Sequence, residues 1–230
     1  MSFPDFNASD AHIQWQRFCD LSWYHDDLGV WLDISRMHVN ASDLQQLQPR
    51  MDKAFVAMQE LEAGAIANPD EQRQVGHYWL RTPELAPSSE LQQHISREID
   101  LIAAFGRDVS NGTIKAPNGE AFTDVLWIGI GGSGLGPALM IKALQNPGEG
   151  LPFHFFDNVD PNGMSNVLAG LEGRLDRTLV VTVSKSGGTP EPHLGMEQAR
   201  HRLEAAGGQW AGQAVAVTML DSKLDQQAQK

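Results

Sequence analysis

The chain has 230 residues, of which 41% are hydrophobic and 20% charged, and its 17 basic residues against 29 acidic residues give a formal net charge of −12 at pH 7. These values describe a globular chain that can bury a core, and they argue against a nucleic acid or an anionic membrane surface as a partner. The apolar runs are far shorter than the roughly 20 residues of a membrane-spanning helix, and the acidic N-terminus lacks the features of a signal peptide. The single cysteine, Cys19, cannot form an intramolecular disulfide. We therefore expect a cytoplasmic protein.

Residues 1–112 are predicted to be mainly helical. Near their start, residues 28–34 are rich in Val, Trp and Ile and favour a short extended segment whose partner is not evident. Ser42 is a good N-cap, and apolar residues after it recur at three- and four-residue spacing. This pattern predicts an amphipathic helix that ends at Gly64.

Two more helices are predicted before residue 112. Asn68 and Pro69, followed by two carboxylates, are typical of a helix start, and this helix would run to Arg81. Ser88 or Ser89 would cap a third helix, whose apolar residues share one face and which Gly112 closes.

Residues 113–122 form a linker or small hairpin, because Asn118-Gly119 suits a type I′ turn. Residues 123–230 then alternate between apolar strands and helices, which predicts an α/β fold with a doubly wound parallel sheet. The chain stops at Lys230 inside an uncapped helix, so we expect this domain to be truncated at its C-terminal end. The predicted strands are 125–130, 153–157, 178–183 and 214–220, and the predicted helices are 134–144, 161–168, 190–206 and one that opens near 221 or 222.

A glycine-rich loop, residues 129–137 (GIGGSGLGP), follows the first of these strands and opens a helix. Glycines allow close backbone approach and a helix N-terminus offers unpaired N–H groups, so the loop can hold an anion. Gly129, Gly131 and Gly134 also satisfy the dinucleotide pattern G-x-G-x-x-G, with Asp157 placed where a ribose-binding acid would lie. A tight turn without any ligand is the third interpretation.

A second motif, residues 184–191 (SKSGGTPE), follows the third strand. Its hydroxyls, its ammonium group and its backbone N–H groups can converge on one tetrahedral anion, as a phosphate monoester requires. A simple helix cap would explain Thr189 and Pro190, but it would not explain Lys185 between two serines. A dinucleotide site has no need of this second loop.

The two motifs, residues 126–140 (LWIGIGGSGLGPALM) and 181–191 (VTVSKSGGTPE), together with residues 68–81 (NPDEQRQVGHYWLR), resemble the glucose-6-phosphate isomerase family. The SKSGGTPE element alone resembles sugar-isomerase (SIS) domains in general, and the glycine loop narrows the resemblance. Many family members have threonine where this chain has Ser186, and aspartate where it has Gly134. The resemblance implies a flavodoxin-like SIS domain over 123–230, preceded by the helical segment 1–112.

The resemblance also implies the chemistry. Glucose 6-phosphate and fructose 6-phosphate would interconvert through a cis-enediol, without cofactor or metal, in a full-length homodimer. The catalytic glutamate, histidine, arginine and lysine of the family would lie beyond residue 230, so this chain would contain no catalytic residue and be inactive alone. Glu191 would be a supporting carboxylate. The phosphate would be bound by Ser184, Lys185, Ser186 and Thr189, and the sugar would be flanked by Gly132 and Ser133.

Two other functions remain open at this stage. One is a non-catalytic SIS module that senses sugar phosphates, although such regulators usually carry a basic DNA-binding segment and the helical segment here is acidic. The other is a nicotinamide-dependent dehydrogenase built on the glycine loop. A zinc site is not indicated, because no two of the eight histidines have the spacing of a zinc pair.

Overall fold

A computed structural model describes residues 3–146 and 148–229 of the chain. The chain divides into two compact units, Met1–Arg97 and Glu98–Lys230. The division falls inside one long helix, α3 (Ser89–Ser110). The predicted domain boundaries at residues 112 and 122 stay predictions.

The first unit begins with a helix and a hairpin. Helix α1 (Ala11–Leu21) leads into strands β1 (Ser22–His25) and β2 (Val30–Asp33), which pair antiparallel. The extended segment predicted over residues 28–34 is therefore confirmed, and its partner is β1. The guanidinium of Arg17 is buried and donates to the carbonyls of Ser35, Pro4, Met37 and Val39 at 2.8–2.9 Å.

Helix α2 (Ala41–Glu62) follows and confirms the predicted amphipathic helix. Its N-cap is Asn40 rather than Ser42, because the Asn40 side chain accepts from two backbone N–H groups while the Asp43 carboxylate accepts from the Asn40 N–H. This reciprocal capping box starts the helix earlier than the sequence alone suggested. No residue of α2 is buried.

The helix predicted over residues 68–81 is wrong. Asn68 does accept from the N–H groups of Asp70 and Glu71, as an N-cap would, but Gln72 has a φ of 51° and the Arg73 N–H turns back to the Asn68 carbonyl. A left-handed residue cannot continue a right-handed helix, so the segment forms turns. These turns bury Trp79, whose Nε1 donates to the Glu62 carbonyl at 2.9 Å.

The third predicted helix and the small hairpin after it are both present. A short 3₁₀ helix, η1 (Pro83–Leu85), precedes α3, which confirms the third predicted helix. Residues 113–122 form a small hairpin with a bridge between Lys115 and Ala121. Its turn differs from the predicted type I′, because in this turn only Gly119 has a positive φ. A turn followed by one left-handed glycine replaces it.

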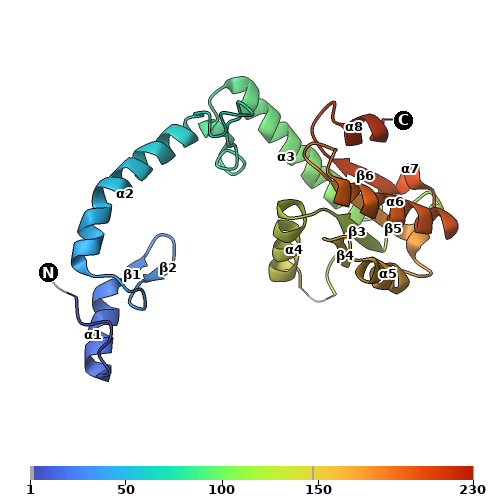
Figure 1. Cartoon of the computed structure of the whole chain (residues 1–230). Helices are drawn as coiled ribbons and strands as arrows, with labels where there is room; N and C mark the ends of the chain where they lie inside the picture. Colours follow the sequence, from blue (N-terminus) through green and yellow to red (C-terminus); the bar gives the residue numbers. More distant parts are fainter. Residues whose placement is uncertain (1–2, 147, 230) are drawn as a thin grey trace. The chain divides into compact units, whose positions relative to one another are not determined.

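The second unit is built on a parallel sheet in the order β4-β3-β5-β6 (Figure 1). The predicted α/β fold with a doubly wound parallel sheet is therefore confirmed, and each predicted strand and helix of this region is present with small shifts at its ends. The strands are β3 (Asp124–Ile128), β4 (Phe153–Phe156), β5 (Thr178–Val183) and β6 (Ala214–Val217). The helices are α4 (Gly132–Leu144), α5 (Pro161–Gly170), η2 (Leu175–Arg177), α6 (Pro190–Ala205), α7 (Trp210–Gln213) and α8 (Lys223–Ala228).

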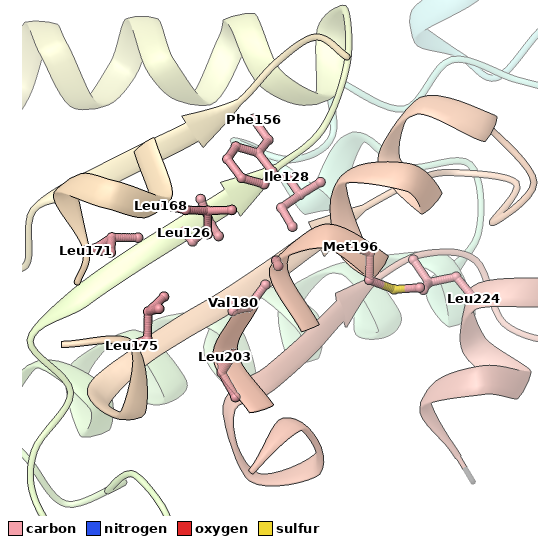
Figure 2. Close-up of a cluster of buried hydrophobic side chains, with 11 residues drawn as sticks. Leu126, Ile128, Phe156, Leu168, Leu171, Leu175, Val180, Met196, Leu203 and Leu224 are labelled. Carbon is pink, nitrogen blue, oxygen red and sulfur yellow. The ribbon is translucent and has the colours of Figure 1, made fainter. Parts of the chain in front are cut away.

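Side chains alternate between the two faces of this sheet because successive strand residues point in opposite directions. Leu126 and Ile128 of β3 pack with residues of α5 and α6 on one face (Figure 2). Val125 of β3 packs on the other face with Val109 of α3 and Phe122. The sheet is thus covered on both sides, which is why its strands are apolar throughout.

Candidate functional site

The site lies where the winding of the sheet reverses. From β3 the chain moves to β4 on one side, and from β4 it returns past β3 to β5 on the other side. The loops after β3 and β5 therefore leave two adjacent strands and lead to opposite sides of the sheet. They begin at the same level, because Ile128 near the end of β3 is in register with Thr182 near the end of β5. In open parallel sheets, ligands bind outside the carboxyl ends of the strands at such a switch point. The glycine loop and the Ser184–Thr189 loop follow these two adjacent strands and form the candidate site.

The glycine loop turns tightly from β3 into α4. The Gly129 N–H donates to the Phe156 carbonyl at 3.0 Å, and the indole Nε1 of Trp127 donates to the Ser133 carbonyl at 2.7 Å. A Cβ at Gly134 would collide with the Gly129 carbonyl, so only glycine allows this close approach. The turn is thus held in place by β4, through the Phe156 carbonyl, and by the Trp127 side chain of β3.

The predicted sugar-flanking residues lie at the beginning of α4. Gly131 is the N-cap residue and has no side chain to bind the first N–H groups of the helix. Gly132 is exposed and Ser133 is partly buried. Within the described residues, no backbone carbonyl accepts from the Gly132 N–H. The positive end of the helix dipole is thus available to an anionic or polar ligand.

The second loop joins β5 to α6 and carries the predicted phosphate ligands. Ser184 is 4% exposed, and its hydroxyl donates to Thr189 Oγ1 at 3.3 Å. Lys185 and Ser186 are exposed at the open side of the loop. The Ser186 hydroxyl accepts from the Gly188 N–H at 3.3 Å, and the Gly187 N–H donates to the Ser184 carbonyl at 3.2 Å. The loop therefore closes on itself through short turns.

Thr189 does not act as a simple helix cap. It occupies the N-cap position of α6, but its side chain makes no capping hydrogen bond and instead meets the Ser184 hydroxyl. Pro190 at the first helical position has no N–H to satisfy. The interpretation of this motif as a cap alone loses its main support, since the Thr189 hydroxyl accepts from the Ser184 hydroxyl instead of capping α6. Glu191 is partly buried in the first turn of α6.

The loop is closely packed from behind. The space between Thr182, Ser184 and Met196 has a volume of about 10 Å³, which is at the lower limit for one water molecule. A cavity of about 620 Å³ does exist beside the edge strand β6, but Trp210 and Ala211 line it and neither loop motif does. A phosphate can therefore reach the Ser184–Thr189 loop only from its open side.

Sequence reasoning missed the support of this loop from the next strand. The Ser184 N–H donates to the Val217 carbonyl at 3.1 Å, and Thr218 Oγ1 donates to the Ser184 carbonyl at 2.7 Å. Ser222 Oγ lies 2.7 Å from Thr218 Oγ1. The two hydroxyl residues just after β6 were a possible signal, but no spacing rule connects them to a loop more than 30 residues earlier.

An ion network around the buried carboxylate of Asp124 lies at the opposite, amino end of the strands. Asp124 is 1% exposed, and its carboxylate accepts from Arg174 Nε at 2.9 Å and contacts His154 Nε2 at 2.8 Å. Burial alone would raise the pKa of the Asp124 carboxyl, but hydrogen bonds from Arg174, His154 and Thr123 outweigh burial and hold the pKa below its ordinary value. Because this end faces away from the two loops, the network stabilises the fold and takes no part in the site.

Two other kinds of site can be assessed over residues 3–146 and 148–229. No group of three or more His, Cys, Asp or Glu side chains in these ranges has the geometry of a metal site. In the same ranges, no helix is both long enough and apolar enough to cross a membrane.

Asp157, the acid predicted for a dinucleotide site, follows β4, and its carboxylate accepts from the Asn158 side chain at 2.8 Å.

Comparison with known proteins points to one family. Residues 33–227 match the family model described as phosphoglucose isomerase. The chain is 99% identical over 230 residues to a glucose-6-phosphate isomerase of Synechococcus sp. strain CC9605, and 51% identical over 230 residues to that of Prochlorococcus marinus strain MIT 9211. A crystal structure of a glucose-6-phosphate isomerase from Chlamydia trachomatis matches 97% of the chain with a TM-score of 0.76 and 29% identity. The first two matches extend over the whole of this chain. The chain nevertheless spans only 43% of the length of each of these three relatives.

Proposed function

Because this chain belongs to the phosphoglucose isomerase family, we propose that it supplies the phosphate-binding loops of an isomerase that interconverts glucose 6-phosphate and fructose 6-phosphate. The single observation that carries this proposal is the position of the Ser184–Thr189 loop beside the glycine loop at the switch point of the sheet. Two adjacent loops rich in donors suit a ligand with one phosphate and several hydroxyls. A nicotinamide site would leave the second loop without a purpose.

Each predicted ligand has a part in this proposal. Ser184, Lys185, Ser186 and Thr189 bind the phosphate, since hydroxyls and an ammonium group give charge-assisted hydrogen bonds to a dianion. The N–H of Gly132 and the hydroxyl of Ser133 contact the sugar. These local donors outweigh the net charge of −12, because solvent screens distant charges beyond about 8–10 Å.

Glu191 would act as a supporting carboxylate in the first turn of α6, a position that its negative charge favours.

In the proposed reaction a base removes the proton from C2 of open-chain glucose 6-phosphate. The resulting cis-enediolate takes up a proton at C1 while the proton of the C2 hydroxyl passes to the oxygen on C1, which gives fructose 6-phosphate, so no electrons leave the substrate and no redox partner is required. The base, the ring-opening group and the cation that steadies the enediolate come from protein outside these 230 residues, which span 43% of the length of two relatives from Synechococcus strains. We place the reaction in the cytoplasm, in a full-length homodimer, with no nucleic acid partner.

Calorimetric titration of the chain with glucose 6-phosphate tests the binding role. We expect saturable binding by the chain and a loss of about tenfold or more in affinity in Lys185→Ala, because one charge-assisted contact is worth roughly 1.5–3 kcal/mol. Lys142→Ala is the matched control: it removes the same charge from the far end of α4 and should leave the affinity unchanged. Equal binding by the wild type and Lys185→Ala would refute the assignment of this loop.

A solvent-exchange assay tests the reaction. In deuterated water, a full-length isomerase that works through a cis-enediol incorporates solvent deuterium at C1 or C2 of the sugar phosphate. The 230-residue chain by itself should bind substrate without either isomerising it or exchanging its protons. Turnover by this chain alone would contradict the proposal that the base lies elsewhere.

A further inference from the structure

A short chain of hydroxyl groups connects α8 to the back of the Ser184–Thr189 loop. The N–H of Asp225 donates to Ser222 Oγ at 3.0 Å, and Ser222 Oγ lies 2.7 Å from Thr218 Oγ1. Thr218 Oγ1 in turn contacts the Ser184 carbonyl at 2.7 Å. Neither Thr218 nor Ser222 belongs to the ligands proposed above.

The direction of these hydrogen bonds follows from proton counting. A carbonyl oxygen can only accept, so the single hydroxyl proton of Thr218 is donated to the Ser184 carbonyl. Thr218 can then only accept from Ser222, and Ser222 accepts from a backbone N–H with its lone pairs. The donors therefore run one way, from α8 through two hydroxyls to the backbone of the loop. Such chains hold their members in one arrangement because each group has a single role.

Other contacts hold the same two segments together. The Met219 N–H donates to the Lys185 carbonyl at 3.2 Å. Gly187 lies so close to α8 that a Cβ there would stand 2.5 Å from the Leu224 nitrogen. Asp221, at a φ of 60°, bends the chain between β6 and α8, and its N–H donates to the Asp225 carboxylate at 2.8 Å. This bend brings Ser222 under Thr218.

We propose that Thr218 and Ser222 are positioning residues, which act through the backbone of the Ser184–Thr189 loop to set its affinity for the phosphate of the substrate. The inference rests on the proposed function of this loop. Neither residue needs to touch the ligand. Their hydroxyl chain holds the carbonyl of Ser184, and with it the direction in which the hydroxyl of Ser184 and the backbone N–H groups that follow are presented.

The test compares Thr218→Val, Thr218→Ser and Ser222→Ala in the 230-residue chain, titrated calorimetrically with inorganic phosphate and with glucose 6-phosphate. Valine keeps the shape of threonine and removes the donor, so the dissociation constants for both ligands should rise by about fivefold to tenfold. Serine keeps the hydroxyl and should restore affinity to within about twofold of the wild type. Ser222→Ala removes the donor to Thr218 and should weaken binding in the same direction.

Thr178→Val is the matched structural control. Thr178 is buried, whereas Thr218 is partly buried; like that of Thr218, the hydroxyl of Thr178 donates to a backbone carbonyl, that of Arg174 at 2.9 Å, but at the opposite end of β5. This variant should lower the thermal unfolding midpoint about as much as Thr218→Val while leaving both dissociation constants unchanged.

The outcomes separate the inference from the function on which it rests. If Lys185→Ala loses affinity while Thr218→Val and Ser222→Ala bind like the wild type, the proposed function stands and the positioning role is wrong. If Thr178→Val weakens binding as much as Thr218→Val, the effect is one of general stability and the inference is again overturned. If the wild type binds neither ligand, the proposed function fails, and the positioning role fails with it.

Discussion

Ser184 is held both through its backbone and through its side chain. Its N–H and its carbonyl both bond to the segment after β6, and its hydroxyl meets Thr189. The residues beside it, Lys185 and Ser186, are exposed. A backbone that is already fixed lowers the entropy lost on binding, because fewer groups still have to be ordered.

Gly187 gives a prediction at this scale. Its φ of 66° and its closeness to α8 mean that Gly187→Ala would strain the backbone and push Leu224 and Ser222 away. We expect a loss of about 1–3 kcal/mol in the free energy of unfolding, together with weaker phosphate binding. Denaturant unfolding of the two forms measures the loss.

Gly188→Ala provides the control for this prediction. Its Cβ would meet only the Ser186 hydroxyl oxygen at 3.8 Å, an ordinary contact. Its free energy of unfolding should stay within about 0.5 kcal/mol of the wild type. Similar losses in both variants would show that the close approach of Gly187 to α8 is unimportant.

In the second unit, the carboxyl ends and the amino ends of the strands carry different features. The carboxyl ends of β3 and β5 present the loops and the N-termini of α4 and α6, where partial positive charge favours an anion. The amino ends hold the network of Asp124, His154 and Arg174, which ties β3 to β4 and to the turn before β5. Ligand binding and structural ion pairing are thus kept apart by the length of the strands.

The Asp124 network predicts how stability depends on pH. The pKa of its carboxyl is lower in the folded chain than the ordinary value of 3.8, so the unfolded chain takes up the proton first as the pH falls. The contribution of Asp124 to stability is therefore complete above about pH 5 and is lost as the pH drops below about 4 toward the folded pKa. Unfolding by urea at a series of pH values between 6 and about 2.5 measures this slope.

Asp124→Asn should flatten that slope and should cost about 1–3 kcal/mol near neutral pH, because it removes the buried carboxylate that accepts hydrogen bonds from Arg174 and His154. Glu172→Gln, which changes an exposed carboxylate close to Arg174 in sequence, is the control and should keep both the slope and the stability. A wild-type slope that survives in Asp124→Asn would assign the acid sensitivity to other carboxylates.

At the scale of the whole chain, the two units differ in how much they bury. The second unit has two apolar clusters, one on each face of its sheet. The first unit has a small cluster around Trp79, while α2 buries no residue over its 22 positions and the hairpin exposes Trp23, Trp31 and Leu32. Isolated helices and two-stranded hairpins are marginal in water without packing.

Hydrogen exchange should reveal this difference in the 230-residue chain. We expect the amides of α2 to exchange within seconds to minutes, and those of β3 and β5 to be protected by a factor that approaches global stability. Mass spectrometry of peptic fragments gives both rates in one experiment. Protection of α2 equal to that of β5 would show that α2 is covered in solution, for instance by a second copy of the chain.

Sequence patterns predicted correctly those features that depend on residues close together in the chain. The alternation of apolar strands and helices over residues 123–230 predicted the parallel sheet, and the composition of the two loops predicted an anion site. The pattern of Asn68 and Pro69 predicted a helix that does not form, because Gln72 takes a left-handed backbone conformation and Trp79 is buried through turns. Propensity was outweighed there by tertiary packing.

The sequence by itself determined the class of fold and the residues that carry donors, since these depend on periodicity and on side-chain chemistry, and the resemblance of its motifs indicated the family. Only the tertiary structure decided that both loops follow adjacent strands at one switch point, that Thr218 and Ser222 support the second loop from behind, and that Asp124 belongs to the far end of the sheet. These arrangements join residues 30 to 60 positions apart, and strand order rather than local spacing determines such contacts. The net charge of −12 likewise describes only the chain as a whole, whereas the fold places the neutral and positive donors of the two loops at the carboxyl edge of the sheet.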